Sequence, residues 1–115
     1  MTDKLVINKK EKALLVGVIY KKLNQLKVEE HLRELELLAK TAGAKVVGKV
    51  TQKLSRINPS YFIGTGKAEQ IIKQAEELGV SLIIFDDELS PAQIKNYSNL
   101  VKNIKVIDRN ALILD

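Results

Sequence analysis

The chain has 115 residues, of which 45% are hydrophobic and 29% are charged, and its formal net charge at pH 7 is +5. A chain of this size and composition forms a single globular domain with its own core. It contains no cysteine, which excludes disulfides and thiolate metal sites and fits a reducing cytoplasm. No apolar run approaches the ~18 residues of a membrane span, and the first residues lack the apolar centre of a signal peptide. We therefore expect a cytoplasmic protein without a membrane span.

The apolar pattern predicts strands that alternate with helices. Continuous apolar runs at 13–19 and 81–85 are typical of strands covered on both faces, and the second, more apolar run is expected at the centre of the sheet. Residues 44–52 alternate only partly, so this strand is expected nearer an edge. Apolar residues at helical spacing predict amphipathic helices over 28–42 and 66–78.

Capping residues mark the ends of the predicted helices. Gly43 and Gly79 are suitable glycines for the end of the first and second helix. Ser90, Pro91 and Gln93 predict the start of a third helix, with serine as N-cap, proline in the first turn and glutamine completing a capping box.

The remaining segments are short. Residues 53–60 form a loop with an Asn-Pro turn signal, and the apolar triplet 61–63 predicts a short strand. Residues 104–108 predict the last strand. Residues 111–114 are apolar and begin another element, so we expect the chain either to continue or to end by docking them.

The order of these elements predicts an α/β fold with three layers: a mainly parallel β-sheet, Rossmann-like and open, with helices on both faces. The predicted domain covers residues 13–115. Residues 1–12 lack periodicity and are expected to form a flexible or edge segment, in which 5–7 are either a short edge strand or part of a tail.

Charge is unevenly distributed along the chain. Residues 1–28 carry seven lysines against Asp3 and Glu11, residues 49–67 carry no acid, and residues 68–94 are mainly acidic. Such a separation indicates one face that meets phosphates, and the alternative is that the lysines serve solubility.

The loop Gly64, Thr65, Gly66 and Lys67 opens the second helix without forming a P-loop. A P-loop needs G-x-x-x-x-G-K-[ST], and here the glycines are two apart and Ala68 replaces the hydroxyl residue. The dinucleotide pattern G-x-G-x-x-G fails as well. Two interpretations remain, a helix start that lets an anion approach the backbone and a tight turn without ligand.

Three acids, Asp86, Asp87 and Glu88, follow the central strand. An apolar strand that ends in acids resembles a Walker-B magnesium site, and it is also common in loops that precede helices, where acids favour the helix dipole. Because no matching P-loop exists, a structural or partner-facing role is the favoured interpretation.

The most credible contact surface is the basic stretch 49–67, which we predict to bind nucleic acid. Its cations are Lys49, Lys53, Arg56 and Lys67. Tyr61 and Phe62 add stacking faces of the kind that hold looped or single-stranded RNA, or else they belong to the core.

A catalytic site is not predicted. His31 is the one histidine, at the edge of the first helix's apolar stripe, and no G-x-S-x-G elbow occurs. Neither a Walker A loop nor an N-K-x-D motif is present, so we expect this chain to be non-catalytic by itself and to hold no cofactor or metal.

Six short phrases, in their order along the chain, resemble the N-terminal domain of the HflX family of GTP-binding proteins. They are Gln52-Lys53, Asn58-Pro59, 61–67 (YFIGTGK), 85–91 (FDDELSP), 106–109 (VIDR) and 112–115 (LILD). Thr65 departs from the lysine common in that family, and Asn110 departs from its threonine.

The resemblance implies a ribosome-associated translational GTPase that binds the large subunit and separates ribosomal subunits under stress. It implies a helical hairpin and a GTPase domain after this domain, with GTP and Mg²⁺ bound there. The expected role of this chain is docking on ribosomal RNA and modulation of that GTPase domain. The alternatives are a nucleotide-binding module for ATP or GTP, with phosphates at Gly64, Gly66 and Lys67 and magnesium at Asp86 and Asp87, and a protein-interaction domain that uses residues 86–88.

Overall fold

The computed structural model describes residues 11–21 and 23–113, so the predicted edge segment at 5–7 lies outside the described residues. In chain order the elements are β1 (Lys12–Ile19), α1 (Gln25–Thr41), β2 (Lys45–Lys53), α2 (Thr65–Glu77), β3 (Leu82–Phe85), α3 (Pro91–Leu100), β4 (Lys105–Asp108) and α4 (Arg109–Ile113). All strand pairs are parallel. The predicted α/β class is confirmed.

The sheet has the strand order β2-β1-β3-β4. The chain therefore steps outward from β1 to β2 and then returns past β1 to β3. This reversal is a topological switch point, and in open α/β sheets ligands bind outside the carboxyl ends of the strands at such points. As predicted, β3 is central and β2 lies at an edge.

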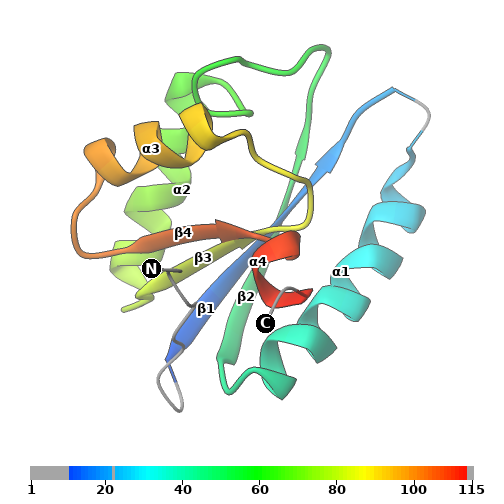
Figure 1. The fold of residues 1–115 in the computed structure, drawn as a ribbon. Helices are drawn as coiled ribbons and strands as arrows, with labels where there is room; N and C mark the ends of the chain where they lie inside the picture. Colours follow the sequence, from blue (N-terminus) through cyan, green and yellow to red (C-terminus); the bar gives the residue numbers. More distant parts are fainter. Residues whose placement is uncertain (1–10, 22, 114–115) are drawn as a thin grey trace.

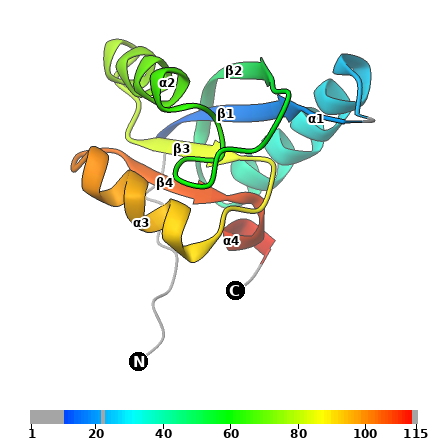
Figure 2. The same cartoon turned by 90° about the horizontal axis from the view of Figure 1, so that it is seen from above.

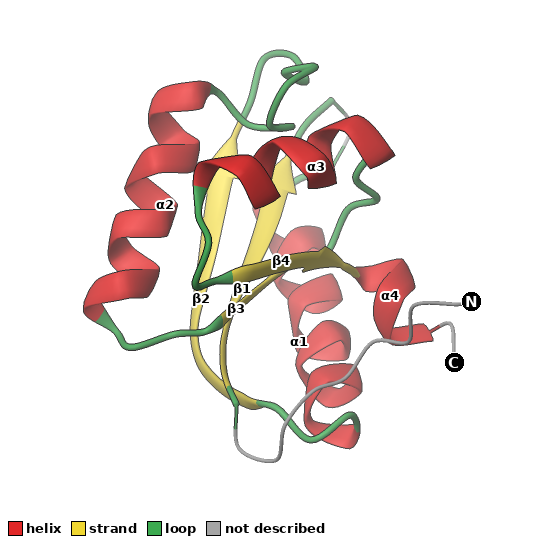
Figure 3. Cartoon of the chain, turned by 60° about the vertical axis from the view of Figure 1, so that its left-hand side comes forward, coloured by secondary structure: helices red, strands yellow, loops and turns green. Residues whose placement is uncertain are grey.

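Three layers result, with α2 and α3 on one face of the sheet and α1 and α4 on the other (Figures 1 and 3). Each strand serves both layers because successive side chains alternate between faces. In β1, Leu14 and Val16 pack toward α2 and α3, whereas Ala13 and Leu15 pack toward α1. This double burial explains why β1 and β3 appear in the sequence as continuous apolar runs.

The capping predictions are confirmed. Ser90 accepts from the Gln93 backbone N–H at 3.1 Å, and the Gln93 side chain accepts from the Ser90 N–H at 2.8 Å. Gly43 and Gly79 both follow their helices with positive φ, at 103° and 70°, where a side chain would be strained. Within 11–21 and 23–113, no helix combines the length and apolarity needed to cross a membrane.

One predicted strand is wrong. Residues 61–63 form a turn instead, joined to the preceding loop by an isolated antiparallel bridge between Asn58 and Phe62. Phe62 has a φ of 70°, which no extended strand allows. An apolar triplet is also compatible with a buried turn, and here the neighbouring Asn58 and α3 determine which conformation forms.

Candidate nucleic-acid interface

A pocket of about 620 Å³ lies in the connection between β2 and α2. In Figure 2 this connection folds over the carboxyl edge of the sheet beside α3. Three of the four predicted basic residues, Lys53, Arg56 and Lys67, line it, and none of its lining residues is acidic. None of these three cations forms an ion pair with any of the described residues. The pocket therefore concentrates uncompensated positive charge.

The start of α2 adds to this positive field. Its N-cap is Gly64, which lines the pocket and has no side chain to cap the first N–H groups. The Lys67 ammonium donates to the backbone carbonyl of Lys53 at 3.3 Å, so it stays at the pocket with its charge unneutralised. Free N–H groups and lysine together favour an anion at this place.

Neither glycine of this loop is required by the fold. Gly64 has a φ of −60°, Gly66 is not among the positive-φ glycines, and a Cβ at either position would meet nothing within 4 Å. A tight turn therefore does not explain these two residues. Gly64, which lines the pocket, leaves the backbone open there.

Lys49 lies apart from the other three cations. Its ammonium is 2.6 Å from a carboxylate oxygen of Glu36 on α1, and Lys40 is 3.4 Å from the other oxygen of that carboxylate. The hydrogen bond from Lys49 is the main cause that lowers the pKa of Glu36. Lys49 is thus neutralised within the domain, whereas Lys53, Arg56 and Lys67 are not.

A hydrogen-bonded turn forms the wall beside the pocket. The Asn58 side chain accepts from the N–H groups of Ser60 at 2.8 Å and Tyr61 at 2.9 Å. The Asn58 and Phe62 backbones exchange hydrogen bonds at 2.8 and 2.9 Å. These bonds hold Phe62 in its positive-φ conformation, which costs on the order of 1–3 kcal/mol for a bulky residue.

Helix α3 packs against this turn and holds it through three hydrogen bonds. Three side chains of α3 donate to its carbonyls: Gln93 to Asn58, Asn96 to Ser60 and Tyr97 to Tyr61, at 2.9, 2.9 and 2.7 Å. The Tyr61 ring packs edge-on against Tyr97, and the Phe62 ring packs edge-on against Phe85. Both rings are half-buried against the core, so the basic side chains make up the accessible part of the predicted contact surface.

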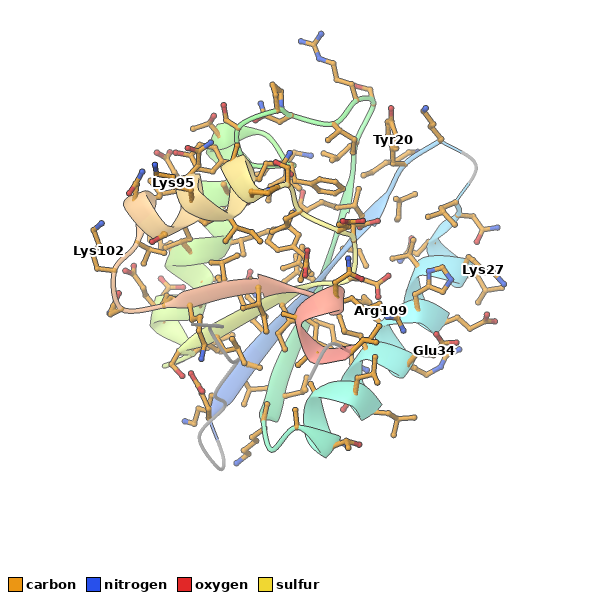
Figure 4. All side chains as sticks on the ribbon, in the orientation of Figure 1. Tyr20, Lys27, Glu34, Lys95, Lys102 and Arg109 are labelled. Atoms are coloured by element: carbon orange, nitrogen blue, oxygen red, sulfur yellow. The ribbon has the colours of Figure 1, made fainter. Side chains whose placement is uncertain are left out.

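Asp86, the first of the three acids after β3, belongs to a different cluster, which includes residues of α1 and α4. Arg109 donates to Asp86 at 2.9 Å and to Glu34 of α1 at 3.1 Å, and His31 lies 3.7 Å from Asp86. Figure 4 shows Arg109 and Glu34 facing each other. Burial raises the pKa of Asp86 despite the opposing attraction of Arg109. The sequence pattern offered no signal for this contact, because Arg109 and Glu34 are 75 residues apart.

Asp87 has no hydrogen-bond or ion-pair partner among the described residues. Burial, reinforced by the negative charge of Asp86, raises its pKa to about 6. Glu88 is exposed. The pocket that Gly64 and Lys67 line includes none of these acids, and Gly66 is exposed in the first turn of α2. The pocket thus brings Gly64 and Lys67 together with Lys53 and Arg56, and its lining does not include the acids of the alternative nucleotide site.

Replacing Asp87 by asparagine is expected to stabilise the domain at neutral pH. Because the folded-state pKa is about 6 against 3.8 for the free side chain, the folded chain binds more protons between these values, and the free energy of unfolding falls as pH rises through this window. Asp87→Asn removes that loss. We expect the free energy of unfolding to rise by about 1 kcal/mol at pH 7, a value reduced to allow for the partial exposure of the side chain. Urea unfolding across this window and up to neutral pH measures it.

Glu88→Gln is the matched control, since it makes the same charge change at an exposed neighbour. In this variant the free energy of unfolding is expected to depend on pH as it does in the unmodified chain. Equal slopes for Asp87→Asn and Glu88→Gln would contradict the assignment. A smaller slope of the same sign remains in Asp87→Asn, because the pKa of Asp86 is also raised.

The parallel sheet with its switch point defines this class of protein as a doubly wound α/β domain, and this member has a basic pocket without acidic lining residues in the connection between β2 and α2. The chain belongs to the family of GTP-binding GTPase N-terminal domains, whose model matches residues 29–115. This family is that of the N-terminal domain of HflX, so the resemblance seen in the sequence is confirmed.

Relatives named GTPase HflX support this membership. The protein of Flavobacterium psychrophilum is 46% identical over 115 residues, which is 100% of this chain and 27% of the relative. That of Caldanaerobacter subterraneus is 43% identical over 106 residues, 92% of this chain and 24% of the relative. That of Escherichia coli is 39% identical over 105 residues, 91% of this chain and 24% of the relative. The chain thus spans about a quarter of the length of these curated relatives.

Proposed function

We propose that this domain docks an HflX-type GTPase onto ribosomal RNA of the large subunit and modulates the GTPase domain of that protein. The observation that carries the proposal is the pocket at which Lys53, Arg56 and Lys67 meet without an acidic neighbour or an ion-pair partner among the described residues. Uncompensated cations around one concave site are the electrostatic footprint of nucleic-acid binding. Lys49, already paired with Glu36, contributes less.

In this proposal, GTP binding and hydrolysis take place in a separate GTPase domain. The GTPase domain that the resemblance implies binds GTP with Mg²⁺, and this domain is non-catalytic and acts in the cytoplasm during stress. The residues of the N-terminal domain bind the RNA and orient the protein on it. The flexible ammonium groups of Lys53 and Lys67 act as point charges for phosphates, and the guanidinium of Arg56 adds a planar, multidentate donor.

The contact between α4 and α1 supports the modulating role. α4 follows β4 directly, and Arg109 at its start binds both Asp86 after β3 and Glu34 of α1. The backbone of Leu89 also donates to the buried Asp108 at 2.9 Å. In this proposal, these bonds couple the carboxyl edge of the sheet to α4.

Neutralising the pocket is expected to weaken binding to the large ribosomal subunit. The variant combines Lys53→Gln, Arg56→Gln and Lys67→Gln. Because it removes three phosphate contacts, we expect about 100-fold weaker binding at low salt, and a salt dependence of log K that is shallower by about 2. Co-sedimentation with purified large subunits over a salt series measures both quantities.

The control variant carries the same charge change on exposed lysines of α2, α3 and the loop after α3, namely Lys73→Gln, Lys95→Gln and Lys102→Gln. It is expected to bind within a few-fold of the unmodified chain. Equal losses in both variants would mean that only net charge matters, and unchanged binding of the pocket variant would refute the proposal.

A further inference from the structure

The pocket between β2 and α2 has two kinds of wall. Lys53, Arg56 and Lys67 contribute cations, whereas Ile57 and Pro59 contribute apolar surface. Pro59 is exposed and Ile57 is half-buried, and neither belongs to the core clusters of the domain. A site for phosphate alone needs no apolar wall, so this lining fits a ligand that has both a phosphate and a flat apolar group.

The volume of about 620 Å³ falls in the range of roughly 300–1,000 Å³ that is typical of small-molecule sites. It is a concave site held in shape by the Asn58 turn and by α3. A regular RNA duplex offers phosphates on its outside but keeps its bases stacked and paired inside. A duplex thus satisfies the cations of this pocket and leaves the apolar wall unused.

We infer that the pocket receives one unpaired RNA nucleotide, with its phosphate at Lys53, Arg56 and Lys67 and its base against Ile57 and Pro59. This inference rests on the proposed function and specifies the RNA that the domain selects, a bulge, loop or strand end rather than a helix. The side-chain-free position Gly64 leaves the backbone N–H groups at the start of α2 open to the phosphate. An apolar wall of this kind contacts any base face, so the selection is for unpaired structure rather than for sequence.

The test compares three fluorescently labelled RNAs in binding titrations with the full chain: a short single strand, a blunt duplex, and the same duplex with one bulged nucleotide. We expect the single strand and the bulged duplex to bind about tenfold more tightly than the blunt duplex, because only these two offer an unpaired base to the apolar surface of Ile57 and Pro59. Uridine monophosphate is expected to compete only weakly, because it has a single phosphate and lacks the adjacent nucleotides of an RNA strand.

Two variants separate the roles of the walls. Ile57→Asn keeps charge and approximate size, and it is expected to abolish the preference for the bulged duplex. Ile94→Asn, at an exposed position of α3, is the control and is expected to keep the preference. Gly64→Asn supplies the missing cap of α2, so it is expected to fold at least as stably, and to weaken binding of every RNA by occupying the N–H groups. Gly64→Asn thus tests the phosphate contact, and the comparison of the three RNAs in the unmodified chain tests the preference for an unpaired base even if Ile57→Asn fails to fold.

Three results would overturn the inference. They are equal or tighter binding of the blunt duplex, an unchanged preference in a folded Ile57→Asn variant, and a mononucleotide that binds more tightly than RNA, which would indicate a free-nucleotide site. Each leaves the proposed function standing if binding to the large subunit still depends on the three cations. If that dependence is missing, the proposed function itself fails.

Discussion

Replacing Gly17 by valine is expected to destabilise the domain by about 3 kcal/mol, because the side chain would have to enter a closed contact between β1 and α1. A Cβ at this buried glycine would lie 2.8 Å from a methyl carbon of Val28 and 3.1 Å from Leu32. Val28 is β-branched and stiff, so it cannot move aside without a shift of α1. Urea or thermal unfolding monitored by circular dichroism measures the loss.

The stability of Gly17→Ala is expected to lie between that of the unmodified chain and that of Gly17→Val, because alanine adds only the first clashing atom. Gly66→Ala is the control at a glycine with open space around it, and it is expected to be neutral or to stabilise α2 by up to about 1 kcal/mol. A Gly17→Val variant as stable as Gly66→Ala would show that β1 and α1 are not in the close contact described.

Replacing Tyr97 by alanine is the second large effect, with an expected loss of about 4 kcal/mol. Tyr97 is 2% exposed, and its ring packs against Tyr61 and Phe85 at centroid distances of 5.2 and 5.6 Å. Its hydroxyl donates to the Tyr61 carbonyl at 2.7 Å. Burial raises the pKa of Tyr97 far above its usual range, so the hydroxyl remains a donor at every pH at which the protein works.

Tyr97→Phe separates the hydrogen bond from the packing. It is expected to cost only about 1–2 kcal/mol, because the ring stays and one buried carbonyl loses its donor. Hydrogen exchange gives a local measurement: the Phe62 amide, which donates to Asn58, should lose most of its protection in Tyr97→Ala and little in Tyr97→Phe. Equal stability of the two variants would contradict the role of the ring.

The cationic part of the candidate site was accessible from the sequence because it depends on local composition. Lys53, Arg56 and Lys67 stand in a stretch without acids, and a short connection between neighbouring elements keeps such residues near one another. Lys49 belongs to the same stretch but not to the same site. It lies within β2, where its side chain reaches Glu36 of α1, a contact that no local pattern shows.

The wall of the site could not be predicted in the same way. The triplet 61–63 has the apolarity of a strand, yet Asn58 and three side chains of α3 determine its turn. Gln93 illustrates the difference within one residue. Its capping bond to Ser90 spans three residues and was predicted, whereas its bond to Asn58 spans 35 and was not.

The sequence by itself determined the class of fold, the helix ends, the central position of β3 and the family, because these depend on periodicity, on residues a few positions apart and on ordered motifs. Only the tertiary structure decided which charges are free. Lys49 and Asp86 are paired, whereas Asp87 and the three pocket cations have no ion-pair partner among the residues described. A charge's partner is set by which elements pack together, and that information is distributed over the whole chain.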